Sequence, residues 1–213
     1  MEPDADLRDA IYATRLDLVE FLIGALADVP SEAFLESLLE GEIEPPSTGV
    51  DEDIDRGFDL LERFVEENRD RSPDAVRDDL AVEYTRLFVG PRPPAMPHES
   101  YHREDADFLG KAVTVLEADY GAAGWSPPED YPEESDHVAV ELAFLRYLIE
   151  AQREGREEAL GYERVFHEEH LSRWIDDFAS DTVDLADGPF YEAVGHLLRG
   201  FVAFEGDLAE QAR

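Results

Sequence analysis

Apolar residues recur at three- and four-residue intervals along most of the chain, which is the pattern of amphipathic helices. The first such stretch, Leu7 to Ala27, places its apolar side chains along one wide stripe. A second helix is expected after Pro30-Ser31, with the serine as its cap and Gly41 as its stop. Residues 42–50 contain two prolines and a glycine and are expected to form a loop. A third helix is expected from about Asp51 to Asn68.

The same periodicity predicts five further helices, separated by segments rich in proline and glycine. Four of them are expected from Ser72-Pro73 to Gly90, from about Glu104 to Tyr120, from Ser135-Asp136 to about Glu154 and from Pro189 to about Ala209. The other is a single helix that runs through Trp174 and Phe178. No alternating strand pattern of useful length and no internal repeat is present. The sequence therefore predicts an all-α bundle of about eight to ten helices, with residues 1–213 forming a single domain.

The segment from Glu83 to Tyr101 is unlike an ordinary connection between helices. It begins on the apolar face of a helix, with Tyr84, Leu87 and Phe88, and that helix is expected to stop at Gly90-Pro91. Prolines at 91, 93, 94 and 97 then hold the backbone extended. We interpret the segment as a stiff loop that presents Met96, His98, Glu99, Ser100 and Tyr101 at the surface, whereas Tyr84, Leu87 and Phe88 fit a core position at least in part.

The charge is strongly acidic, with 53 Asp and Glu against 18 Lys and Arg and a formal net charge of −35. Lys111 is the only lysine. A hydrophobic fraction of 43% with clear helical periodicity argues against disorder. Such a surface is typical of a cytosolic protein from a very salty cell, where self-repulsion is screened within about 3 Å at 1 M salt. We interpret the acidic residues as a solvated surface rather than as a binding surface for a basic partner.

Composition also excludes several classes of function. There is no basic stripe to neutralise phosphates, so no nucleic-acid partner is expected. The absence of cysteine excludes disulfides, thiolate metal sites and a cysteine nucleophile. The first residues lack the basic region of a secretory signal, and no apolar run approaches the ~20 residues that span a bilayer. We therefore expect a cytoplasmic protein without stable membrane insertion.

Catalytic motifs are weak in this chain. No glycine-rich phosphate loop and no Gly-x-Ser-x-Gly elbow is present, which leaves Ser100 a poor nucleophile. His167 and His170 share a helix face and define one alternative, a metal-dependent helical enzyme, but the spacing is one residue short of the zincin motif. Two exposed histidines in an acidic helix are the simpler interpretation.

Asp136-His137 opens a helix, with Glu141 one turn later on the same face. Ser135 or Asp136 as the helix N-cap is the simple interpretation of this stretch. The functional interpretation is that Asp136, His137 and Glu141 lie exposed at the N-terminal end of a helix and bind a cationic ligand.

Two signatures in this chain resemble those of the TorD/DmsD family of molybdoenzyme chaperones. The first is Tyr84-Thr-Arg-Leu-Phe88 with Gly90-Pro91 and then Pro97-His-Glu-Ser100-Tyr101. The second is Glu133-Glu134-Ser135-Asp136-His137 with Glu141 beyond, where Glu134 stands at the family's proline position. The segment His170-Leu-Ser-Arg-Trp174 and the pair Phe190-Tyr191 resemble the family's C-terminal pattern. The likeness covers most of the chain from about Leu80 onward.

This resemblance implies a TorD-like, cofactor-free cytosolic chaperone that is not an enzyme. Its partner would be the twin-arginine leader, and in some cases the body, of a molybdopterin oxidoreductase, which it would hold back from export until cofactor insertion. A nitrate-reductase-type assembly chaperone that reads no exported leader is the near alternative, and both monomer and homodimer stay open. We expect the two signatures to converge into one receptor. The residues assigned to peptide binding are Tyr84, Leu87, Phe88, Gly90, Pro91, Pro97, Ser100, Tyr101, Trp125, Asp136, His137 and Glu141.

Overall fold

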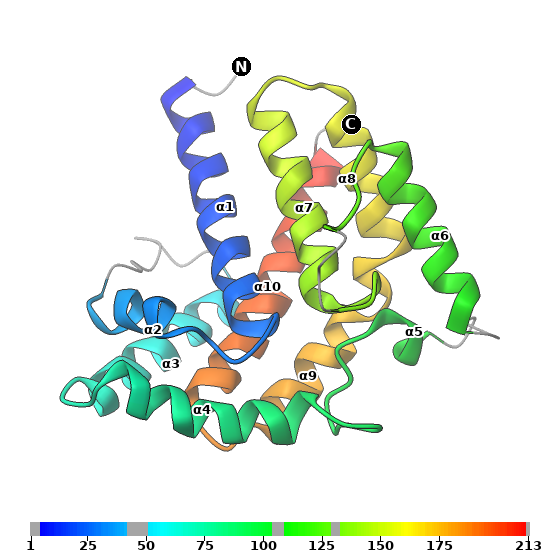
Figure 1. The fold of residues 1–213 in the computed structure, drawn as a ribbon. Coiled ribbons are helices and arrows are strands. Elements are labelled where there is room, and N and C mark those ends of the chain that lie inside the picture. The colour runs from blue at the N-terminus through cyan, green and yellow to red at the C-terminus, as the bar shows by residue number, and fades with distance from the viewer. Residues whose placement is uncertain (1–4, 42–50, 104–108, 129–132, 212–213) are drawn as a thin grey trace.

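The computed structural model describes residues 5–41, 51–103, 109–128 and 133–211 (Figure 1). Within these ranges it contains ten α-helices, one short 3₁₀ helix and no β-strand, which confirms the predicted all-α class. The helices are α1 (Ala5–Leu26), α2 (Glu32–Leu39), α3 (Glu52–Asn68), α4 (Pro73–Phe88), α5 (Glu99–His102), α6 (Leu109–Ala122), α7 (Val138–Arg153), α8 (Glu158–Glu169), the 3₁₀ helix η1 (Leu171–Arg173), α9 (Ile175–Leu185) and α10 (Pro189–Gln211). The assignment of residues 1–213 to a single domain stays a prediction.

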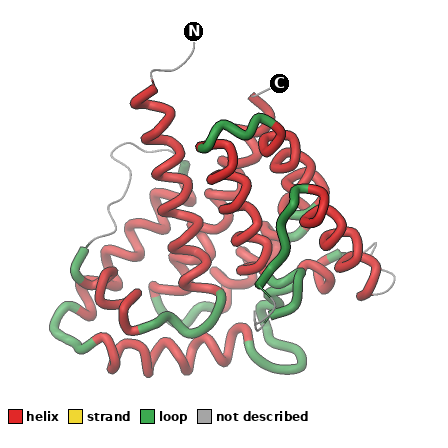
Figure 2. The backbone as a smooth tube through the Cα atoms, turned by 45° about the horizontal axis from the view of Figure 1, so that its top comes forward, coloured by secondary structure: helices red, strands yellow, loops and turns green. Residues whose placement is uncertain are grey.

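The C-terminal helix α10 forms the centre of the bundle. It packs mainly against α3 and α9, while α1 packs along α7 (Figures 1 and 2). The apolar stripe predicted for α10 is fully buried, as shown by the side chains of Phe190, Tyr191, Val194, Leu197, Leu198 and Phe201. Burying each such side chain contributes roughly 1.5–3 kcal/mol, so this one helix anchors much of the core.

Three helices begin where local sequence signals place their caps. Ser31 accepts a hydrogen bond from the N–H of Phe34, and Asp51 accepts from the N–H groups of Asp53 and Ile54. Ser72 accepts from the N–H of Ala75, with proline at the following position. Each cap satisfies N–H groups that have no partner within their own helix. The predicted loop at residues 42–50 and the predicted helical residues 104–108 lie outside the described part of the chain.

Two predicted elements are wrong in detail. The single helix expected through Trp174 and Phe178 is broken into α8, η1 and α9, because His170 (φ −124°, ψ −81°) and Trp174 (φ −148°, ψ −23°) are not helical. Neither proline nor glycine causes this break. Instead the side chains of His170 and Trp174 turn inward and bond to residues of other helices, so tertiary contacts override the local preference. The short helix α5, directly after the proline segment, was not expected either.

A glycine allows α9 and α10 to approach closely, and its replacement is our first prediction. A Cβ added at Gly195 would lie 2.9 Å from the carbonyl oxygen of Ala179 and 2.8 Å from a methyl group of Val183. We expect Gly195→Ala to lower the free energy of unfolding by about 1–3 kcal/mol, because backbone must move to relieve the contact. Gly161 in α8 has no such neighbour within 4 Å, so Gly161→Ala should raise stability by about 0.5–1 kcal/mol. Chemical denaturation of the two variants measures both changes, and equal effects would contradict the packing argument.

Candidate functional site

The proline segment and the Asp136-His137 pair meet in space, as the sequence predicted. The N–H of Val138 donates to the carbonyl of Pro97 (2.8 Å), and the N–H of Glu99 donates to the carbonyl of Asp136 (3.0 Å). His98 and His137 form an isolated antiparallel bridge, and their ring centroids lie 5.0 Å apart. The start of α5 is therefore attached to the start of α7 through backbone hydrogen bonds, and these two loops form one structural unit.

Asp136 and His137 are not exposed at the start of their helix, so that part of the expectation is wrong. Asp136 is 0% exposed and His137 is 2% exposed. The Oδ2 atom of Asp136 accepts from the N–H of Ser100 (3.1 Å), which holds α5 in place. His137, rather than Ser135 or Asp136, is the N-cap of α7, because its Nδ1 accepts from the N–H of Ala139 (3.2 Å). Burial, reinforced by nearby His98, lowers the pKa of His137 to about 3, so the ring is neutral and suited to accept.

Glu141 lies beneath the same unit and is 0% exposed. Its Oε2 accepts a hydrogen bond from the indole N–H of Trp174 (3.2 Å). Burial raises the pKa of Glu141 well above its usual value, the charges of Glu99 and Asp136 raise it further, and only the Trp174 donor and Arg103 act in the other direction. Within the described residues, neither Oε1 of Glu141 nor Oδ1 of Asp136 has a hydrogen-bond donor. The site therefore contains two buried carboxyl oxygens without hydrogen-bond partners among the described residues.

Glu99 and His170 complete the site, although neither is among the individual residues assigned to peptide binding. Nδ1 of His170 lies 2.9 Å from Oε2 of Glu99, and its Nε2 lies 3.0 Å from Oδ2 of Asp119. Burial lowers the pKa of His170, but the hydrogen bonds and charges of Glu99 and Asp119 raise it more, so it ends above its usual value. The histidine thus links α5 and α6 to the break between α8 and η1. Glu99, expected at the surface, is 0% exposed.

The idea of two exposed histidines in one acidic helix is wrong. His170 is 0% exposed, and Nε2 of His167 lies 3.0 Å from the carbonyl oxygen of Val202. Across the described ranges, no three side chains of the ligating types are arranged to hold a metal ion. The alternative of a metal-dependent enzyme built on His167 and His170 therefore gains no support from the geometry.

The remaining residues assigned to peptide binding divide into core and surface groups. Tyr84, Leu87 and Phe88 are buried, and the hydroxyl of Tyr84 donates to the carbonyl of Leu26 (3.2 Å). Pro97 is buried as well. Gly90, Pro91 and Tyr101 are exposed, and Ser100 and Trp125 are half-buried. A part in peptide binding stays a prediction for all of them.

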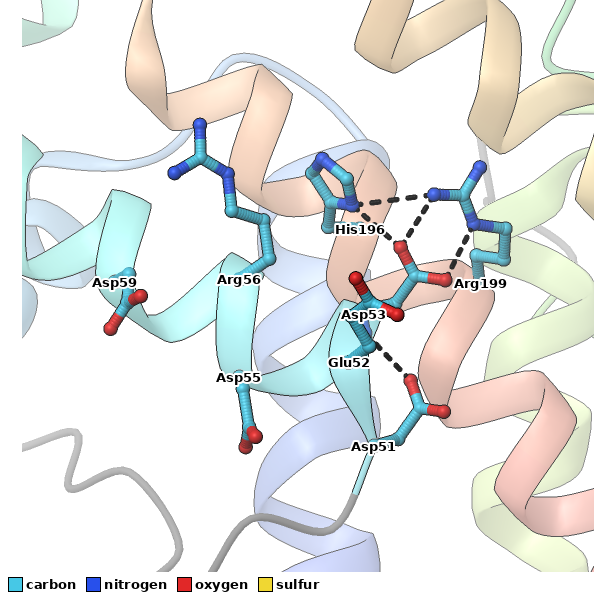
Figure 3. A pocket seen from close by; sticks show the side chains of 8 residues that line it. All are labelled: Asp51, Glu52, Asp53, Asp55, Arg56, Asp59, His196 and Arg199. Carbon is cyan, nitrogen blue, oxygen red and sulfur yellow. Dashed lines mark hydrogen bonds and ion pairs between the residues drawn. The ribbon is translucent and has the colours of Figure 1, made fainter.

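A hollow formed by charged residues lies elsewhere on the molecule. It has a volume of about 910 Å³ and is lined only by charged residues and one histidine from the start of α3 and the middle of α10 (Figure 3). In it, Asp53 bridges His196 and Arg199, and the hydrogen bond from Arg199 does most to lower the pKa of Asp53. None of the residues assigned to peptide binding lines this hollow.

Together, the fold and the site define an all-helical protein without a recognisable catalytic centre among its described residues, in which two ordered sequence signatures form one buried polar unit. The family described as nitrate reductase delta subunit matches residues 47–180. The chain belongs to this family, and the match confirms the resemblance to the TorD/DmsD chaperones that the two signatures suggested.

Individual relatives are named as chaperones. The chain is 31% identical to the chaperone protein TorD of Photobacterium profundum over 133 residues, which cover 58% of this chain and 60% of the relative. It is 29% identical to the chaperone protein TorD of Vibrio parahaemolyticus over 183 residues, covering 81% and 78%. It is 23% identical to that of Shewanella pealeana over 141 residues, covering 62% and 61%. The match to the first and third of these thus spans about three fifths of their length. These names agree with the expectation of a protein that is not an enzyme.

No helix in the described ranges has the length and apolar character needed to cross a bilayer.

Proposed function

We propose that this protein is a cytoplasmic maturation chaperone for a molybdopterin oxidoreductase, and that it binds the twin-arginine leader or the body of that client until the cofactor is in place. The observation that supports the proposal most is the convergence of the two signatures, Pro97–Tyr101 and Asp136-His137, into one unit. The chaperone names of its relatives support the same class of function.

The chemistry of the site suits arginine-rich peptides. A guanidinium pairs with a carboxylate through two parallel hydrogen bonds, which an ammonium cannot reproduce. Asp136 and Glu141 supply carboxyl groups but are buried, and Asp136 is bonded to the N–H of Ser100 in α5. A client peptide must therefore either shift α5 or contact its exposed residue Tyr101. Because long-range attraction is screened in high salt, direct contacts and burial of the leader's apolar stretch have to provide most of the affinity.

Our second prediction tests this function with a synthetic leader. A peptide with two adjacent arginines followed by an apolar stretch should bind about tenfold or more tightly than the same peptide with two lysines, because only guanidiniums form the bidentate pair. Isothermal titration calorimetry at about 1 M salt measures both affinities. At this salt concentration the Debye length is short, so non-specific electrostatic attraction between the peptide and the acidic protein is removed. Equal affinities would remove arginine recognition from the proposal, and no binding of either peptide would contradict leader binding.

The family match favours one second candidate, a nitrate-reductase-type assembly chaperone that binds the mature client and reads no exported leader. Pull-down with the client's leader and, separately, with its leaderless body distinguishes the two. Retention of the body alone would select the second candidate.

A further inference from the structure

One arginine of this chain already occupies a buried carboxylate of the site. Nη1 of Arg103 donates to Oε1 of Glu99 (2.7 Å) and to the carbonyl oxygen of Glu169 (2.9 Å). The Glu99 side chain is 0% exposed, whereas that of Arg103 is 15% exposed. The pair therefore has an inner end, the carboxylate, and an outer end, the guanidinium, which lies at the surface of the protein.

The surroundings of this pair favour a ligand with many N–H donors. Glu99 lies directly beside Asp136, because its N–H donates to the Asp136 carbonyl. Oδ1 of Asp136 and Oε1 of Glu141 are buried carboxyl oxygens that have no hydrogen-bond partner among the described residues. Glu99 and Asp136 raise the pKa of buried Glu141 and Arg103 lowers it, so these three charged groups all lie near Glu141. A guanidinium, with five N–H donors in a planar fork, matches such a cluster better than any other side chain does.

We propose that Glu99 is the carboxylate that receives an arginine of the client peptide, and that Arg103 occupies this position in the free protein as an internal competitor. The inference rests on the proposed function and adds a receptor residue and a means of regulation. Glu99 is also bonded to His170 (2.9 Å), and exchange of one guanidinium for another keeps the second partner of this buried carboxylate in place, which limits the cost of the exchange.

An internal competitor lowers the apparent affinity for the client. Arg103 lies four residues from Glu99 on the same short segment, so its effective concentration at the carboxylate is high. The client binds only the fraction of molecules from which Arg103 has moved away, and its apparent affinity falls by that fraction. Recognition of the client's arginine and occupation of the site by Arg103, which we call self-occupation, therefore depend on the same carboxylate, that of Glu99.

The experiment compares three variants with the unmodified full chain, using the two-arginine leader peptide and its two-lysine counterpart as probes. Arg103→Gln removes the competitor, and Glu99→Gln removes the receptor. Arg173→Gln is the matched control, because Arg173 bonds to the carbonyl of Glu168 (2.9 Å) and to the Glu169 carboxylate (3.4 Å) on the same stretch of chain. Thermal unfolding of each variant, measured alongside titration, shows that each is folded at the temperature of the binding experiment.

We expect Arg103→Gln to bind the two-arginine peptide about tenfold more tightly than the unmodified protein does, and Arg173→Gln to bind it with unchanged affinity. Folded Glu99→Gln should lose its preference for arginine over lysine. Unchanged or weaker binding by Arg103→Gln, when the unmodified protein prefers the arginine peptide, overturns this inference and leaves the proposed function standing. Binding by Arg103→Gln alone supports self-occupation, and binding by none of the proteins overturns both proposals.

Discussion

Replacing Arg15 by methionine should lower the free energy of unfolding by about 3–5 kcal/mol, because it leaves two buried carboxylates without their shared cation. The guanidinium donates to Glu205 through Nε and Nη2 and to Glu163 through Nη2 (2.9 Å). Arg15 is 5% exposed and both carboxylates are 1% exposed. This triad joins α1, α8 and α10 in the interior, so the loss of one member affects three helices together.

The pH dependence of this loss follows from Glu205. Burial raises the pKa of Glu205 to about 7, although the hydrogen bond and charge of Arg15 act in the opposite direction. A carboxyl whose pKa is raised on folding lowers stability as the pH climbs from its unfolded value, near 4.3, through its folded value. Without Arg15 the folded pKa rises further, so the loss should be larger at about pH 8 than at about pH 5.

Chemical denaturation at these two pH values measures the effect of Arg15→Met. Arg56→Met is the control, since Arg56 pairs with Glu192 across α3 and α10 but the two side chains are 51% and 29% exposed, and its effect should be much smaller. Replacing all three residues of the triad by leucine or methionine should recover most of the stability, because no buried charge then remains. A loss below about 1 kcal/mol for Arg15→Met at both pH values would contradict this account.

The sequence predicts the helices well because their signals are local. Periodicity and caps such as Ser72 depend on residues within one or two turns, and these are visible in a single chain. The Arg15 triad depends on partners 148 and 190 positions away, and no local signal connects them. The break at His170 is similar, since it depends on contacts with Glu99 and Asp119 from other helices.

The candidate site shows the same division. The resemblance led us to expect that the two signatures converge, and they do. The burial of Asp136 and Glu141 could not be predicted, since an Asp-His pair at a helix start looks the same whether another segment covers it or not. The proline segment indicates an extended backbone but gives no sign of the short helix that follows it and bonds to Asp136 through Ser100.

Replacing Trp174 by alanine is expected to destabilise the protein by about 3–5 kcal/mol, because it removes a large buried ring and leaves a cavity. Trp174 is 1% exposed, and its ring contacts those of His102 and Phe178 at centroid distances of 5.4 and 5.6 Å. Trp125→Ala is the matched control. The Trp125 ring packs against those of Tyr120 and Phe144 but is only half-buried, so its removal should have a smaller effect.

Trp174→Phe separates the indole hydrogen bond from the packing of the ring, and its effect should depend on pH through Glu141. Folding raises the pKa of Glu141, so the carboxyl is neutral at low pH and becomes charged only as the pH rises through that raised value. A hydrogen bond to the charged form is worth about 1.5–3 kcal/mol and one to the neutral form about 0.5–1.5 kcal/mol. The loss of stability should therefore grow as the pH rises through the raised pKa of Glu141, and the same substitution in a Glu141→Gln background should cost the same at every pH. If urea denaturation shows equal pH dependence in the two backgrounds, Glu141 is not the group that senses the loss of the indole donor.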